Sequence, residues 1–245
     1  MNSLRATWRL WRALVHALAG LATILFVFPR LNDPQREARV QAWSLRMLAL
    51  LCVGLEVRGQ PPKRGPVLLV ANHISWLDIL VMHAACYCRF VSKADVKQWP
   101  LIGTLATGGG TIYIERESRR DALRVVHHVT ASLKRGEVVA VFPEGTTGDG
   151  ITLLPFHANL IQAAISADVP IQPVALGFVD VASGGISRSP SFVGDETMGG
   201  SVWRTVSGPP LVAVVHYGEP EQAAGRGRRE WAADLRSAVD ALRQP

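Results

Sequence analysis

The stretch PVLLVANHISWLDI, residues 66–79, decides the fold of this chain. Its first half is an apolar run of strand composition, and its second half carries Ser75 and Asp78 at the spacing of a helix capping box. We therefore predict a buried strand, a short loop and a helix that begins at Ser75. Asn72 and His73 fall in the loop, just past the carboxyl end of the strand. In open α/β sheets, this edge is where ligands bind.

His73 and Asp78 have the chemistry of a proton-transfer pair. A carboxylate in the first helical turn can reach a histidine that lies two residues before the cap. It would hold one imidazole nitrogen by a hydrogen bond and leave the other nitrogen to act as a general base. The spacing alone also fits a simpler interpretation, in which Asp78 only caps the helix and His73 is a loop residue. Ser75 is not expected to be a nucleophile, because no G-x-S-x-G motif surrounds it.

Strand and helix patterns alternate through the rest of the chain, and a Gly- and Ser-rich stretch at 182–201 is expected to be a long loop. This alternation predicts an α/β fold with a central, mostly parallel or mixed sheet flanked by helices. The further expected strands are 88–93, 111–116, 137–145, 171–178 and 211–218, and the expected helices are 118–135, 159–167 and 221–242.

Two helical stretches precede the sheet. Residues 13–29 are almost wholly apolar, and residues 40–57 have the spacing of an amphipathic helix. We expect residues 1–58 to form membrane-associated helices, as a hairpin in one leaflet or as one span plus an interfacial helix, and residues 59–245 to form the α/β domain. A two-helix cap packed on the domain remains an alternative. A cleaved signal peptide is disfavoured, because no small-x-small cleavage site follows the apolar run.

The composition agrees with a globular domain that carries one apolar attachment. The chain has 245 residues, 48% of them hydrophobic, and a formal net charge of +6. Residues 1–46 hold seven arginines and two acidic residues beside the apolar stretches, which is typical of contact with an anionic membrane surface. No zinc-finger spacing or arginine-rich recognition helix is present, so no nucleic-acid partner is expected. The three cysteines lack metal-ligand spacing, and we expect free thiols.

Four ordered blocks carry a resemblance to a known family. The first, NHISWLD at 72–78, has the form N-H-x-x-x-x-D, and the second is GTIYIER at 110–116. The third is FPEGTT at 142–147, and the fourth is VPIQPVAL at 169–176. In this order they resemble the glycerolipid acyltransferase family, whose best-known members acylate 1-acylglycerol-3-phosphate. The resemblance covers residues 60–180 and extends to the N-terminal apolar stretch.

The resemblance implies an O-acyltransferase that moves a fatty acyl chain to a lysolipid hydroxyl in membrane lipid synthesis. His73 would take the proton from the acceptor hydroxyl and Asp78 would orient His73, with no covalent acyl-enzyme. It further implies acceptor binding by Arg116, Glu144, Gly145 and Thr146, with Asn72, Gly110, Pro143 and Pro170 in supporting positions. For Glu144 an alternative role, bracing the loop, stays open.

The implied partners are a membrane bilayer, a lysolipid acceptor and an acyl thioester donor. The donor would be acyl-CoA or acyl-carrier protein, and no cofactor or metal is expected. The implied location is the cytoplasmic membrane, with the active site at its cytoplasmic face.

Two departures from the family pattern bear on the acceptor. The third block ends in Thr147, where the family usually has arginine, and His157 replaces a basic residue in the segment FHANL at 156–160. Relatives that acylate lyso-ornithine lipid look similar at these positions, so a lyso-ornithine lipid O-acyltransferase is an alternative prediction. A transacylase and a non-catalytic lipid-binding protein are further alternatives.

Overall fold

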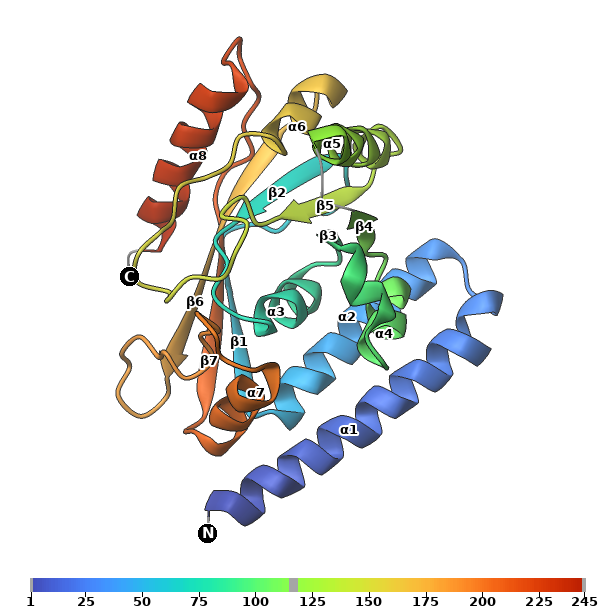
Figure 1. Cartoon of the computed structure of the whole chain (residues 1–245), viewed down its shortest axis with the longest axis vertical. Coiled ribbons are helices and arrows are strands. Elements are labelled where there is room, and N and C mark those ends of the chain that lie inside the picture. The colour runs from blue at the N-terminus through green and yellow to red at the C-terminus, as the bar shows by residue number, and fades with distance from the viewer. Residues whose placement is uncertain (1, 115–118, 244–245) are drawn as a thin grey trace.

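The computed structural model describes residues 2–114 and 119–243, and its centre is a mixed sheet (Figure 1). Within these residues the sheet has seven strands in the order β1-β7-β6-β2-β5-β3-β4. All neighbouring strands are parallel except β6 and β7, which are antiparallel. The expected fold class is therefore confirmed. The strands are β1 Val53–Arg58, β2 Val67–Ala71, β3 Arg89–Lys93, β4 Ile112–Ile114, β5 Val138–Val141, β6 Ile171–Asp180 and β7 Leu211–Tyr217.

Helices cover both faces of the sheet. Strand β2 is buried along its whole length, as expected for a parallel strand covered on both sides. Its Leu69 packs with α2 and α3, whereas its Leu68 packs with α5, α6 and α8. The helices are α1 Asn2–Phe26, α2 Asp33–Leu50, α3 Leu77–Ala85, α4 Ile102–Gly108, α5 Arg119–Lys134, α6 Ile161–Ala167, α7 Met198–Ser207 and α8 Arg228–Leu242, with 3-10 turns η1 Phe28–Arg30 and η2 Ala94–Gln98.

The second N-terminal helix is shorter than its sequence pattern predicts. Helix α2 begins after Asn32, whose side chain forms a reciprocal capping box with Gln35, and it ends at Leu50. The expectation that the helix in the stretch 40–57 ends at Gly54 or just beyond is wrong, because residues 53–58 form β1 and pair with β7. The last residues that we assigned to the N-terminal helices thus belong to the sheet. Pairing with a strand more than 150 residues away overrides the local helical pattern.

Several further boundaries differ from the expected ones, and the strand expected at 137–145 is only Val138–Val141. The Gly- and Ser-rich loop ends at Thr197, which caps α7, so the loop expectation is wrong for residues 198–201. The C-terminal helix begins at Arg228 rather than near 221, because Glu221 forms an isolated bridge with Ile171. Helix α3 begins at Leu77, two residues after the predicted Ser75.

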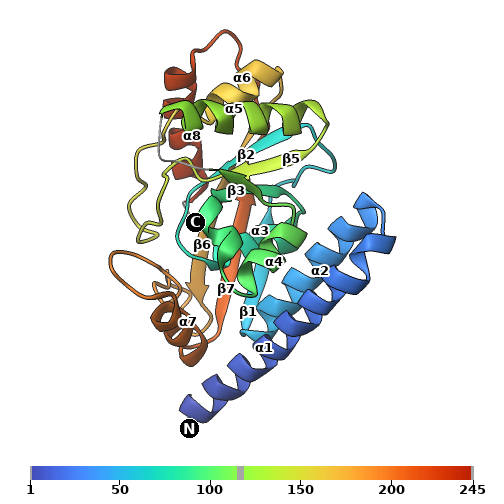
Figure 2. The same cartoon turned by 45° about the vertical axis from the view of Figure 1, so that its right-hand side comes forward.

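Helix α1 lies along the outside of the domain, side by side with α2 (Figures 1 and 2). It begins at Asn2, well before the apolar run at 13–29, and also contacts α4 and α7. Gly20 permits the close approach to α2, since a Cβ there would overlap Trp43. Among the described residues, one helix segment, Ser3–Phe26, is long and apolar enough to cross a membrane.

Candidate active site

His73 and Asp78 meet just past the carboxyl end of β2. The Asp78 carboxylate is fully buried, and its Oδ2 accepts from His73 Nδ1 at 2.7 Å. A carboxylate only accepts hydrogen bonds, so Nδ1 carries the proton and Nε2 is left as the proton acceptor. The His73 side chain is 20% exposed, so a substrate can reach it. The predicted pair is therefore assembled in the geometry of a general base and its orienting carboxylate.

The same carboxylate shapes the loop before α3. Asp78 Oδ2 also accepts from the backbone N–H groups of Ile74 at 2.6 Å and Ser75 at 2.9 Å. The Ser75 hydroxyl in turn accepts from Leu77 N at 3.2 Å, so the capping interactions are present although the helix begins at Leu77. One carboxylate thus caps the helix and also binds the histidine, and its role in catalysis stays a prediction.

Asn72 anchors the loop to the neighbouring strand β6. Its side-chain amide accepts from Leu176 N at 2.7 Å and donates to Leu176 O at 3.0 Å, and the residue is buried. A buried amide with both groups paired costs little to bury and is expensive to disrupt. Asn72 is therefore a structural anchor for His73, in line with its expected supporting position.

Glu144 braces the loop from the other side, at the carboxyl end of β5. Its Oε1 accepts from His73 N at 2.7 Å and its Oε2 accepts from Leu154 N at 2.9 Å. Burial raises the pKa of the Glu144 carboxyl, and these two hydrogen bonds oppose that shift by favouring the charged form. Each oxygen is engaged by backbone, so bracing is the role that the contacts support. Acceptor binding by Glu144 stays a prediction.

The turn after Glu144 brings a second loop onto the site. Gly145 has a φ of 73°, which favours glycine, and Thr146 is exposed beside it. The Thr147 hydroxyl donates to Phe192 O, and Phe192 N donates to Ile74 O at 3.0 Å. The long loop before α7 is thereby attached to the catalytic loop. The position at which the family usually has arginine instead holds a hydroxyl that is used inside the protein.

The remaining predicted residues have structural surroundings. Pro143 O accepts from His157 N at 2.8 Å, and Pro170 O accepts from Leu68 N at 3.1 Å. Gly110 has a φ of 82° and its carbonyl accepts from Arg89 Nε at 2.7 Å. Arg116 lies outside the described residues, so its expected contact with the acceptor stays a prediction. The other supporting residues shape the strand ends rather than the vicinity of the imidazole.

A basic cavity of about 430 Å³ opens beside the end of β4. It lies at the same carboxyl edge of the parallel strands as the catalytic loop, and Ile114 in its wall is two residues before Arg116. Its polar lining comprises Lys97, Gln98, Tyr113, Arg124 and His128. Such a lining suits an anionic group. In the described part of the chain, no three His, Cys, Asp or Glu side chains gather as metal ligands.

Sequence reasoning missed Phe142, which lies flat on the His73 imidazole. The ring centroids are 4.0 Å apart and the planes are 7° from parallel. The strand register contains the signal, because Val70 pairs with Val141 and Phe142 follows directly where β5 ends. Side chains on one face of paired strands become neighbours, so the FPEG block places a ring next to the histidine loop.

Comparison with known proteins gives one family and two kinds of relative. The family model described as Acyltransferase matches residues 54–177. The chain is similar to the 1-acyl-sn-glycerol-3-phosphate acyltransferase of Neisseria gonorrhoeae, with 40% identity over 184 residues that cover 74% of this chain and 71% of the relative. It is also similar to the lyso-ornithine lipid O-acyltransferase of Pseudomonas aeruginosa, with 35% identity over 206 residues that cover 84% and 78%.

The fold has a match among solved structures. The crystal structure of the 1-acyl-sn-glycerophosphate acyltransferase PlsC from Thermotoga maritima superposes with a TM-score of 0.74. The match covers 98% of this chain and 93% of that chain at 20% sequence identity. At this identity the likeness concerns the fold, including the two N-terminal helices.

Proposed function

Because this chain belongs to the acyltransferase family, whose model matches residues 54–177, we propose that it transfers a fatty acyl chain from a thioester to a lysolipid hydroxyl. The observation that carries the proposal is the 2.7 Å contact between His73 Nδ1 and the buried Asp78 carboxylate. It leaves Nε2 as the proton acceptor of a direct hydroxyl attack, with no need for a covalent acyl-enzyme.

Each step of the proposed reaction uses this pair. His73 Nε2 takes the proton of the acceptor hydroxyl while the oxygen attacks the thioester carbonyl carbon. The imidazolium that forms is stabilised by the charge of Asp78 at Nδ1. When the tetrahedral intermediate collapses, the carbon–sulfur bond breaks and the imidazolium returns its proton to the thiolate. The products are an ester and a free thiol, and the pair is restored.

The acceptor is proposed to be a lysolipid of the 1-acylglycerol-3-phosphate type, with lyso-ornithine lipid as the second candidate. The relatives' names support both acceptors. Thr147 favours the second candidate, because its position carries no cation and its hydroxyl is donated to Phe192 O. A phosphate monoester gains most from a fixed guanidinium or ammonium group, and this position supplies neither.

The donor is proposed to be acyl-CoA or acyl-carrier protein, with no further cofactor. Both donors are anionic and carry phosphate, and the cavity with Lys97, Arg124 and His128 is a basic surface at the same edge of the sheet as His73. This charge supports binding of either donor. An activity assay with each donor is needed to distinguish acyl-CoA from acyl-carrier protein.

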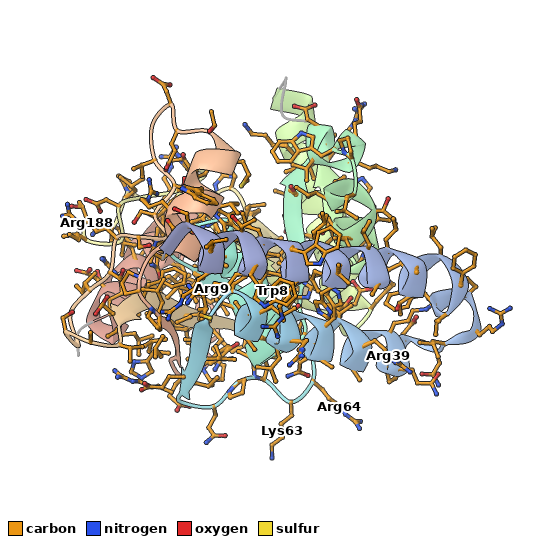
Figure 3. All side chains as sticks on the ribbon, turned by 90° about the horizontal axis from the view of Figure 1, so that it is seen from below. Trp8, Arg9, Arg39, Lys63, Arg64 and Arg188 are labelled. Atoms are coloured by element: carbon orange, nitrogen blue, oxygen red, sulfur yellow. The ribbon has the colours of Figure 1, made fainter. Side chains whose placement is uncertain are left out.

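We also propose that α1 lies in the cytoplasmic membrane, with the active site at the cytoplasmic face. Large apolar side chains of α1 are exposed, including Trp8 at 60% and Leu18 at 50%. Figure 3 shows this face of the molecule, with Trp8 and Arg9 on α1, Arg39 on the neighbouring α2, and Lys63, Arg64 and Arg188 further out on the same view. Because α1 packs lengthwise along α2, a position within one leaflet fits better than a span.

Purified wild type and His73→Ala should be assayed with acyl-CoA and acyl-carrier protein as donors. The acceptors are lysophosphatidic acid, lyso-ornithine lipid and a zwitterionic lysolipid. We expect wild type to acylate one acceptor and His73→Ala to lose roughly 10²–10⁴-fold of that rate. His127→Ala is the matched control, since His127 is exposed on α5. Wild-type transfer to no acceptor from either donor would move the non-catalytic or transacylase interpretation to the front.

A further inference from the structure

His73 is the end of a stack of four aromatic rings that runs into the core. Its imidazole lies on Phe142, Phe142 lies on Phe90, and Phe90 lies on His83. The centroid distances along the stack are 4.0, 5.7 and 5.0 Å, and the interplanar angles are 7°, 14° and 25°. The four rings come from the catalytic loop, the end of β5, strand β3 and the last turn of α3.

The inner end of the stack is buried and uncharged. Phe90 is 2% exposed and His83 is 5% exposed. Burial lowers the pKa of His83 to about 4, so this imidazole is neutral near pH 7. Its Nδ1 has no hydrogen-bond partner among the residues that the structure describes. His83 therefore acts as a flat packing surface, and Tyr87 closes its edge at 5.7 Å.

The stack supplies a constraint that Asp78 alone does not. A hydrogen bond at Nδ1 holds one atom of the imidazole, but the ring can still turn about that contact. Face-to-face packing on Phe142, with the ring centroids 4.0 Å apart, restricts this rotation and so fixes the plane in which Nε2 lies. A ring face beside the imidazole also attracts the positive charge that develops during proton transfer. The two contacts together define both the position and the plane of the base.

We propose that Phe142 is a positioning residue for His73, and that Phe90 and His83 support it as a packed column. This inference rests on the proposed function, because it assigns the column to the proton-transfer step. Substrate recognition should not depend on it, since Phe142 acts through His73. The effect of removing the ring should therefore fall on kcat and leave KM nearly unchanged.

The test compares ring-removing and ring-keeping variants. Phe142→Leu should lower kcat about 10- to 100-fold, because a small misplacement of a reacting group has an effect of this size. Phe142→Tyr keeps the ring and should retain kcat within about threefold, with KM unchanged. Phe90→Leu, one ring further away, should give a smaller loss of the same kind. His83→Phe keeps a flat ring and should retain activity.

Phe178→Leu is the matched control, because Phe178 is 2% exposed in the same core cluster and lies outside the stack. It should reduce thermal stability without a selective loss of kcat. The column is refuted if folded Phe142→Leu keeps the wild-type kcat, or if Phe178→Leu loses kcat equally. Loss of activity in His83→Phe would show that the nitrogens of the His83 imidazole are needed, and not only its flat packing surface.

A second measurement separates this inference from the proposed reaction. The proton on His73 Nδ1 should give a hydrogen-bonded NMR signal that is absent in His73→Ala. This signal should broaden or vanish in Phe142→Leu and persist in Phe142→Tyr, whichever substrates are used. An unchanged signal in Phe142→Leu would overturn the column even if transfer is observed, whereas absent transfer with the predicted signals would overturn only the reaction.

Discussion

The catalytic loop and helix α1 satisfy their side chains in opposite ways. In the loop at 72–78, Asn72 and Asp78 are buried, and backbone or side-chain groups of the protein bind them. In α1, Leu4 is 81% exposed and Phe26 is 68% exposed, so apolar groups face outward. The hydrogen bonds of the loop come from the protein itself, at Asp78 Oδ2 and at both groups of the Asn72 amide, whereas Asp78 Oδ1 has no partner among the described residues. Helix α1 packs on α2, α4 and α7 with one side, and its outward apolar side chains are the ones that we propose to lie in the membrane.

This difference separates the part that needs precise geometry from the part that needs only apolar area. Hydrogen bonds to Asp78 are directional, so one atom out of place removes the contact. Transfer of apolar surface from water is roughly additive, at about 25 cal/mol per Å², and no single side chain decides it. Substitutions in the loop should therefore act singly and strongly, whereas substitutions in α1 should act together and gradually.

The largest effect is expected for Asp78→Asn. The amide can present an N–H group to His73 Nδ1, which favours the wrong tautomer and removes the charge that stabilises the imidazolium. We expect kcat to fall roughly 10²–10⁴-fold. Steady-state kinetics of acyl transfer measure this, with Asp234→Asn on α8, whose side chain is 50% exposed, as the control. Near-normal kcat in Asp78→Asn would show that the carboxylate only caps α3.

A smaller effect is expected for Glu144→Gln. The side-chain amide can accept from only one of the two N–H groups that Glu144 now binds, those of His73 and Leu154. One buried donor is left unpaired, so we expect a stability loss of about 1–3 kcal/mol and a lower kcat. Urea unfolding and kinetics report the two effects, and Glu230→Gln on the exposed side of α8 is the control. A raised acceptor KM without loss of stability would favour direct acceptor binding instead.

For α1 we expect a loss of membrane binding without a loss of folding. The variant combines Trp8→Ala, Trp11→Ala, Leu14→Ala and Leu18→Ala, all at exposed positions. Vesicle sedimentation should show binding that is weaker by about tenfold or more, because apolar area is lost. Unfolding free energy should change by only ~0.5 kcal/mol per site, and alanine keeps the helix.

The matched pair for α1 is Leu18→Ala and Leu123→Ala, since both leucines are exposed, at 50% and 62%. Only the first should weaken vesicle binding, in keeping with the gradual effect expected of a single side chain. Equal binding of vesicles by wild type and the fourfold variant would leave α1 as a cap on the domain.

The smallest effect is expected for Thr147→Val. The substitution removes the hydroxyl that donates to Phe192 O, a contact that is worth about 1 kcal/mol. The loop before α7, which Thr147 holds at Phe192, should loosen. The ratio of kcat/KM for lyso-ornithine lipid to kcat/KM for lysophosphatidic acid should then change about 3- to 5-fold. Thr147→Ser keeps the hydroxyl and should keep the ratio. Identical ratios in all three proteins would remove this residue from acceptor selection.

Motifs close together in sequence were predictable, and long-range partners were not. The block NHISWLD contains both catalytic side chains within six residues, so strand, turn and helix bring them together locally. Strand β1 was mistaken for the end of a helix, because β7, which pairs with it, lies far along the chain. Helix α7 was missed because Gly199 and Gly200 give a loop-like composition, whereas the Thr197 cap and packing on α1 make it helical.

The sequence by itself therefore determined the fold class, the His73 and Asp78 pair and the apolar character of the N-terminal helix. The fold class and the apolar helix follow from local pattern and composition, whereas the pair was identified by the resemblance of four ordered blocks to a known family, because its spacing alone also fits a simple helix cap. Only the tertiary structure decided that Phe142 covers the imidazole, that Glu144 braces its backbone and that Thr147 holds the loop at Phe192. These three contacts join residues that are 45 to 71 positions apart, and strand order and register, rather than local propensity, determine which residues meet.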